Sequence, residues 1–201
     1  MFVSGDTDFS EAFAESVAEV STRRWLKSRR DQTAQHAYEG RLRRKAEFTA
    51  LVTRAHDQLD ALYQRSGTAT KTVGEVKRLP AEKAAVLRAQ KQAILDRLRR
   101  DYAALKAGWN GHADHEHWFQ RPLNNAHLND VETYYRLVPA FHELLREQGG
   151  DLEAYYREAR KLARLSKAER GRRLEHLLSS VHSDTDSRLR YTEESASETG
   201  R

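Results

Sequence analysis

Apolar residues recur at intervals of three and four along most of this chain, which is the period of an amphipathic α-helix. The spacing predicts helices over residues 7–30, 32–65 and 80–107, followed by shorter helices between residues 123 and 178. No stretch shows the strict alternation of apolar and polar positions that a half-buried β-strand requires. We therefore expect an all-α fold, an irregular helical bundle.

The two longest predicted helices, 32–65 and 80–107, lie on either side of a connection that contains Gly67, Gly74 and Pro80. Each helix carries a narrow apolar stripe between charged flanks. Two such stripes can bury each other within one chain, so we expect a long antiparallel helical hairpin. Dimerisation through a coiled coil is the alternative interpretation of the same stripes, and the sequence leaves the oligomeric state open.

The predicted elements divide the chain into four parts. A first helix occupies residues 1–30, the hairpin residues 31–107 and a C-terminal helical part residues 108–178. Residues 179–201 are rich in Ser, Thr, Asp and Glu and contain few apolar residues, so we expect a disordered C-terminal tail.

Composition narrows the classes of partner. Of the 201 residues, 35 are Lys or Arg and 30 are Asp or Glu, which gives a formal net charge of +5. The two signs alternate along the helices, as they do on solvated helix faces, and the basic run at 23–30 suits the C-terminal end of a helix dipole. We therefore expect no nucleic-acid partner, although a basic patch for nucleic acid is the alternative. No apolar run approaches the ~20 residues of a membrane span.

Residues 5–14, Gly-Asp-Thr-Asp-Phe-Ser-Glu-Ala-Phe-Ala, are the stretch where residue type and spacing suggest chemistry. Asp6 or Thr7 can cap a helix by accepting a free backbone N–H of its first turn. Phe9 and Phe13 share a helix face and can anchor it to a core. Glu11 then lies one turn inside the helix. It is either a metal ligand or an ordinary carboxylate favoured by the helix dipole.

A second group of metal-binding residue types lies in the predicted loop 108–122. Its histidines are His112, His115 and His117. Their spacing of three and two residues matches no structural zinc motif, so we expect an exposed loop rather than a metal site. Its large aromatic residues should tether it to the rest of the protein; they are Trp109, Trp118 and Phe119.

Three segments of the chain carry motifs in a fixed order. The first comprises Gly5-Asp6-Thr7, Phe9, Glu11, Phe13-Ala14 and then Trp25-Leu26. The second comprises Leu123-Asn124-Asn125-Ala126, Tyr134-Tyr135 and Val138-Pro139-Ala140-Phe141. The third comprises Gly149-Gly150-Asp151-Leu152 and Tyr155-Tyr156. Together they resemble a bacterial family of zinc aminopeptidases related to the gluzincin metallopeptidases, with Ser10 where the family usually carries Asn.

The resemblance implies peptide hydrolysis at a zinc ion. It implies that Glu11 is the third protein ligand of the zinc. By position, it makes Tyr134 or Tyr135 the donor that stabilises the oxyanion, whereas a pair of core tyrosines is the alternative. Asn124 and Asn125 become candidates for binding the peptide substrate, and capping of the following helix is their alternative role.

One motif of that family is missing. Gluzincins bind zinc through His-Glu-x-x-His, and the 201 residues contain no such sequence. We therefore expect an N-terminally truncated chain that binds no zinc and has no activity on its own. A non-catalytic helical scaffold derived from such a peptidase is the alternative. The resemblance suggests the bacterial cell envelope, the chain shows no signal peptide, and the compartment stays open.

Overall fold

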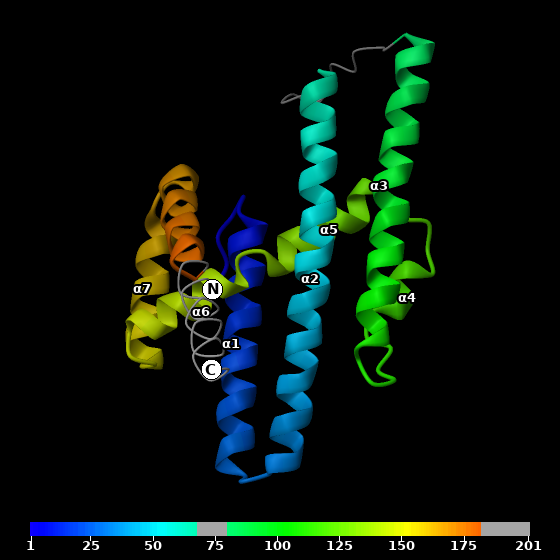
Figure 1. The fold of residues 1–201 in the computed structure, drawn as a ribbon. Helices are drawn as coiled ribbons and strands as arrows, with labels where there is room; N and C mark the ends of the chain where they lie inside the picture. The colour runs from blue at the N-terminus through cyan, green and yellow to red at the C-terminus, as the bar shows by residue number, and fades with distance from the viewer. Residues whose placement is uncertain (68–79, 182–201) are drawn as a thin grey trace, which may run out of the picture. The chain divides into compact units, whose positions relative to one another are not determined.

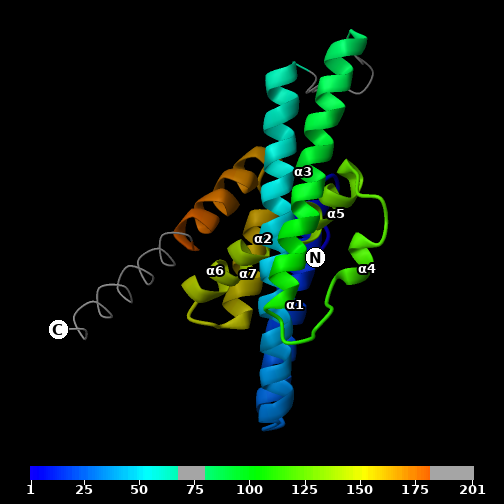
Figure 2. The same ribbon diagram turned by 45° about the vertical axis from the view of Figure 1, so that its right-hand side comes forward.

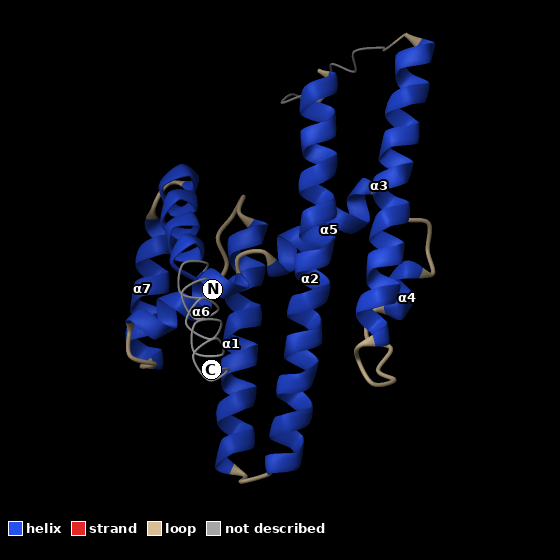
Figure 3. Cartoon of the chain, in the orientation of Figure 1, coloured by secondary structure: helices blue, strands red, loops and turns tan. Residues whose placement is uncertain are grey.

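The computed structural model describes residues 1–67 and 80–181, and these residues form helices and connecting loops without any strand (Figures 1 and 3). In chain order the helices are α1 (Thr7–Ser28), α2 (Gln32–Ser66), α3 (Ala81–Ala107), α4 (Glu116–Phe119), α5 (Asn125–Tyr135), α6 (Val138–Glu147) and α7 (Leu152–Arg164). Residues 167–181 are also helical. The prediction of an all-α fold is confirmed.

The chain divides into two compact units. The terminal unit combines Met1–Thr22 with Thr133–Arg201, and the hairpin unit consists of Arg23–Glu132. The terminal unit is therefore discontinuous in sequence, with the whole hairpin unit between its two segments.

Aromatic side chains form the core of the terminal unit. Phe9 and Phe13 of α1 contact Phe141 of α6, with ring centroids 5.2 and 5.7 Å apart. Phe13 also stacks on Tyr155 of α7 at 5.9 Å. Leu174, from the helical residues 167–181, belongs to the same buried cluster. Each fully buried side chain of this size contributes roughly 1.5–3 kcal/mol to folding, so this contact set holds α1 firmly in place.

In the hairpin unit, α2 and α3 pack side by side in antiparallel directions (Figures 1 and 2), as the sequence predicted. The Asp31 carboxylate begins α2 by accepting the Ala34 N–H at 2.9 Å. Gly67 ends it with a φ of 68°, the left-handed conformation that glycine adopts without strain. Pro80 directly precedes α3, where its missing N–H has no helical partner to lose.

Three side chains depart from the pattern of apolar stripes and charged flanks. Arg44 belongs to a charged run of α2, yet it is buried, because the distant Asp114 pairs with it. Trp25 and Val86 are apolar residues of α1 and α3, but they are 57% and 53% exposed. Periodicity identifies the face of a helix, but it does not show which turns of that face have a neighbour.

Two further expectations lie partly or wholly outside the described residues. Residues 68–79, most of the predicted connection 66–80, are not described, and neither are residues 182–201 of the expected disordered tail 179–201. The last helix continues through residue 181. Within the described parts of the chain, no helix combines the length and the apolar character that crossing a membrane requires.

Candidate functional site

The turn before α1 fixes the position of the candidate ligand Glu11. Asp6 is the residue that caps the helix, since its Oδ1 accepts the Phe9 N–H at 3.4 Å. The Ser10 hydroxyl donates to the Asp6 carbonyl at 2.9 Å and accepts the Val3 N–H at 3.0 Å. Asp6 and Ser10 are thus engaged in shaping the helix start.

A buried ion pair connects the same turn to the last described helix. Arg170 donates from Nε and Nη2 to Asp6 Oδ2, at 2.8 and 2.7 Å. Its guanidinium also donates from Nη1 to the Leu165 carbonyl at 2.9 Å and lies 5.1 Å from the centre of the Phe9 ring. Arg170 thus joins the start of α1 to the C-terminal helix, so Asp6 and Arg170 have a structural role.

Glu11 differs from Asp6 and Ser10, whose side chains form hydrogen bonds at the helix start. Its side chain is partly exposed, and its carboxylate forms no hydrogen bond or ion pair with any described residue. The helix beneath it is firmly packed, because Phe9, Ala12 and Phe13 are buried. Glu11 is therefore a fixed carboxylate that packing and hydrogen bonding do not use.

The side chains around Glu11 do not complete a zinc site. A catalytic zinc in a protein normally has three protein ligands. No group of three or more His, Cys, Asp or Glu side chains in the described part of the chain is arranged to hold a metal ion. The sequence contains no His-Glu-x-x-His either, so the described residues do not supply the ligand set of such a zinc ion.

The two candidate tyrosines lie at the C-terminal end of α5. Tyr134 is 44% exposed and Tyr135 is half-buried, with their ring centres 6.2 Å apart. Glu11 forms no hydrogen bond with either hydroxyl. Tyr134 is the more exposed of the two, and a role of either tyrosine in catalysis stays a prediction.

The two candidate asparagines belong to the start of α5. Asn124 Oδ1 accepts the His127 N–H at 3.1 Å, which is the geometry of a helix cap. Asn125 Nδ2 donates to the Tyr63 hydroxyl at 3.1 Å, a contact between α5 and α2. Both side chains thus have a structural partner, and substrate binding by either remains a prediction.

The structure reveals two polar contacts in the terminal unit that periodicity did not predict. The buried Tyr155 hydroxyl lies 2.7 Å from Ser16 Oγ, which donates to the Phe13 carbonyl at 2.8 Å. Withdrawal from water raises the pKa of Tyr155 to about 12. In the second contact, Glu19 of α1 lies 2.7 Å from His142 Nε2 of α6. The sequence did contain a signal for the second contact: the four-residue spacing of Glu11, Glu15 and Glu19 places their side chains on one helix face.

The histidine-containing loop is attached to the hairpin, and its histidines do not converge. His115 stacks on Phe48 of α2, with ring centres 4.1 Å apart, and the accompanying loss of water lowers its pKa. Trp109 donates to Glu47 at 2.6 Å, while Phe119 stacks on Tyr102 at 4.0 Å. The predicted aromatic tethers are confirmed, whereas the expectation of an exposed loop fails at His115.

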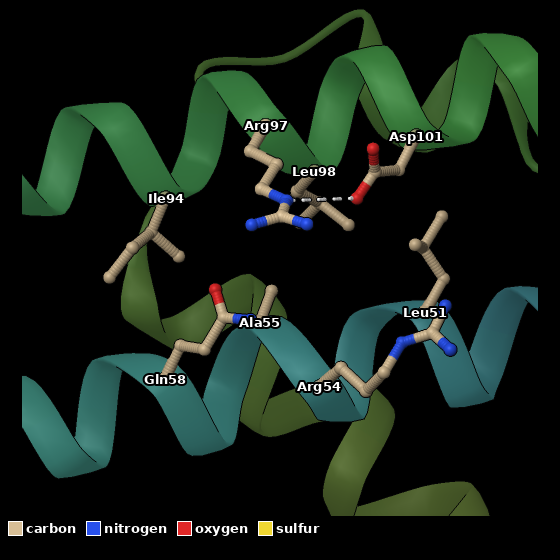
Figure 4. A pocket seen from close by; sticks show the side chains of 8 residues that line it. All are labelled: Leu51, Arg54, Ala55, Gln58, Ile94, Arg97, Leu98 and Asp101. Atoms are coloured by element: carbon tan, nitrogen blue, oxygen red, sulfur yellow. Dashed lines mark ion pairs between the residues drawn. The ribbon is translucent and has the colours of Figure 1, made fainter.

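One hollow lies between α2 and α3, with a volume of about 280 Å3 (Figure 4). Its lining combines apolar side chains with Arg54, Gln58, Arg97 and Asp101. Arg97 and Asp101 form a loose ion pair at 3.6 Å. No residue predicted from the sequence to form a site lines this hollow, and it contains a single carboxylate.

Together, these observations define an all-α protein whose matched motifs mostly build a core, with the partly exposed carboxylate of Glu11 on the first helix. The sequence profile of the family described as "Putative aminopeptidase" matches residues 1–174, and the chain belongs to this family. The match includes all three motif segments. No curated protein and no solved structure shows significant similarity to the chain.

Proposed function

We propose that this protein works in zinc-dependent hydrolysis of peptides from their N-terminal end, and that Glu11 supplies one carboxylate ligand of the zinc. Membership of an aminopeptidase family supports the reaction class. The carboxylate of Glu11, held on a packed helix and without a partner among the described residues, supports the choice of ligand. This unused carboxylate is the single observation on which the assignment rests.

The remaining parts of such a site are not among the 201 residues. Two histidine ligands and a general base, which gluzincins take from one His-Glu-x-x-His helix, have no counterpart in the sequence. We therefore propose that the chain acts only together with a segment that carries this motif. Alone, it should bind no stoichiometric zinc and hydrolyse no peptide.

Two residue pairs complete the proposal. Tyr134 or Tyr135 would donate a hydrogen bond to the developing oxyanion, and the greater exposure of Tyr134 supports that residue. Asn124 and Asn125 would contact the peptide backbone in addition to their contacts at the start of α5. Removal of the oxyanion donor should lower kcat by about 100–1,000-fold.

The test begins with translation of the DNA upstream of the Met1 codon in the same reading frame. A product that includes His-Glu-x-x-His is then purified, and its zinc content and its hydrolysis of aminoacyl anilides are measured. Glu11→Gln should abolish both. Glu15→Gln makes the same change one helical turn further along and should leave both intact. Zinc content and turnover that survive Glu11→Gln would overturn the assignment.

The alternative function is that of a helical scaffold that has no catalytic role. In that case the upstream reading frame lacks the motif, and Glu11→Gln leaves the cellular role of the protein unchanged. The same pair of measurements therefore distinguishes the two functions.

A further inference from the structure

The end of α1 and the turn into α2 form a strongly basic segment with an exposed aromatic ring. Its sequence is Arg23-Arg24-Trp25-Leu26-Lys27-Ser28-Arg29-Arg30, which we call the basic tip. Five of its eight residues are cationic and none is acidic. By contrast, residues 1–22 contain five acidic residues and no Lys or Arg. The whole basic tip belongs to the hairpin unit.

Packing does not account for Trp25. Its side chain is 57% exposed, whereas the neighbouring Leu26 is only 7% exposed. The contact made by its indole ring within the described residues is with Arg29, whose guanidinium carbon lies 5.3 Å from the ring centre. An indole in water exposes a large apolar surface beside a polar N–H, and rings of this kind favour the interface between a membrane and water.

The positive charge of the basic tip is only partly neutralised. Arg23 pairs with Glu39 of α2 at 2.8 Å. Asp31, the acidic residue that follows the tip, uses its carboxylate to cap α2. Lys27 and Arg30 form no ion pair within the described parts of the chain.

Helix-end electrostatics does not explain all of this charge. The field of a helix dipole acts within its last turn. Lys27 lies in that turn of α1, but Arg29 and Arg30 follow Ser28, where the helix ends. Arg29 and Arg30 donate their backbone N–H groups to the Trp25 and Lys27 carbonyls, and the clustering of three cations here exceeds what one helix end requires.

We propose that the basic tip docks reversibly on a membrane surface of anionic phospholipid, with the Trp25 indole among the lipid headgroups. Lys27, Arg29 and Arg30 would lie against the lipid phosphates. A Lys or Arg close to such a surface is worth roughly 1 kcal/mol, about fivefold in partitioning. A single-stranded nucleic acid would instead stack its bases on open aromatic faces, and Arg29 covers one face of this indole.

The experiment mixes the 201-residue protein with vesicles of phosphatidylcholine and phosphatidylglycerol, or of phosphatidylcholine alone, and measures bound protein by sedimentation. We expect binding to the anionic vesicles only, and loss of binding at high salt. Tryptophan fluorescence should shift to shorter wavelength on binding. Because Trp109 and Trp118 also fluoresce, the shift must disappear in Trp25→Phe.

Matched variants test the location of the contact. Lys27→Gln with Arg30→Gln removes two tip cations and should weaken partitioning about 25-fold. Lys83→Gln with Arg88→Gln removes two exposed cations from α3 and should change it far less. Circular dichroism checks that both variants keep their helices.

Three results would overturn the proposal. They are no binding of the unaltered protein to anionic vesicles at low salt, equal weakening by the two double variants, and binding to single-stranded RNA without binding to vesicles. The last result would assign the basic tip to a nucleic-acid partner.

Discussion

The buried ion pair between Asp6 and Arg170 offers a quantitative test of what holds the terminal unit together. The Arg170 and Asp6 side chains are only 4% and 9% exposed, and two guanidinium nitrogens lie 2.7–2.8 Å from one carboxylate oxygen. Asp6→Asn removes the charge but retains an oxygen that can cap α1, because Asn caps helices as well as Asp does. The substitution therefore isolates the pair from the cap.

The expected loss follows from burial. Removing one partner of a buried ion pair costs about 3–5 kcal/mol, because the other charge stays buried without compensation. Arg170 keeps its hydrogen bond to the Leu165 carbonyl and its position over the Phe9 ring. We therefore expect Asp6→Asn to lower the free energy of unfolding by about 3 kcal/mol, the low end of that range. Arg170→Met should cost a similar amount.

The assay is urea unfolding followed by far-UV circular dichroism. The double variant Asp6→Asn with Arg170→Met leaves no unpaired charge, so it should lose at least about 1 kcal/mol less than the sum of the single variants. Asp31→Asn, at the exposed cap of α2, is the control and should change stability by less than about 0.5 kcal/mol. Additive single effects, or a loss below about 1 kcal/mol for Asp6→Asn, would refute the reasoning.

Three more predictions concern the two cores. Phe141→Ala should cost about 3–5 kcal/mol in urea unfolding, because a fully buried ring that contacts two others is lost; Val86→Ala, at an exposed position, should cost little. Because the pKa of Tyr155 is raised from 10.0 to about 12, its neutral form stabilises the fold fully below pH ~10 and this contribution, about 2–3 kcal/mol, is lost as the pH rises toward 12. The free energy of unfolding should therefore fall more steeply between pH 10 and 12 in the unaltered protein than in Tyr155→Phe. Equal slopes would contradict the raised pKa of Tyr155. Arg44→Met should lower the free energy of unfolding by about 1–2 kcal/mol, less than the loss of a fully buried pair, because Asp114 stays one-third exposed. Faster proteolysis between residues 108 and 122 would confirm that the loop has been released. An unchanged cleavage rate would show that the pair does not hold the loop.

Most of the helices were predictable because their signals are local. A three- and four-residue spacing of apolar positions located α2 and α3 to within a residue or two. Gly67 marked the end of α2, and Pro80 marked the start of α3. The lack of strict alternation between apolar and polar positions correctly argued against strands. The same reasoning identified Phe9 and Phe13 as anchors of α1.

The errors concern contacts between residues far apart in sequence. Arg44 and Asp114 are separated by 70 positions, so nothing near Arg44 indicated that a carboxylate would reach it. Val86 lies on a periodic face that has no neighbour at its turn. The apolar period shows which face of a helix can be buried, whereas the tertiary fold determines which element packs against that face.

The candidate site was predictable in part. Spacing placed Glu11 on an anchored helix, and the structure adds that its carboxylate has no partner among the described residues. The motif residues around it proved to be capping and packing residues. Resemblance alone could not separate these roles, because a motif contains residues that build the fold beside those that carry out chemistry.

The discontinuous terminal unit has a consequence for synthesis of the protein on the ribosome. Between Thr22 and Thr133 the ribosome must translate the 110 residues of the hairpin unit. At roughly 5–20 residues per second, this takes on the order of 5–20 s. During that time Phe9 and Phe13 have been made but Phe141 has not, so the apolar face of α1 stays without its core. The nascent chain therefore presents a binding site for chaperones that closes only when α6 and α7 emerge.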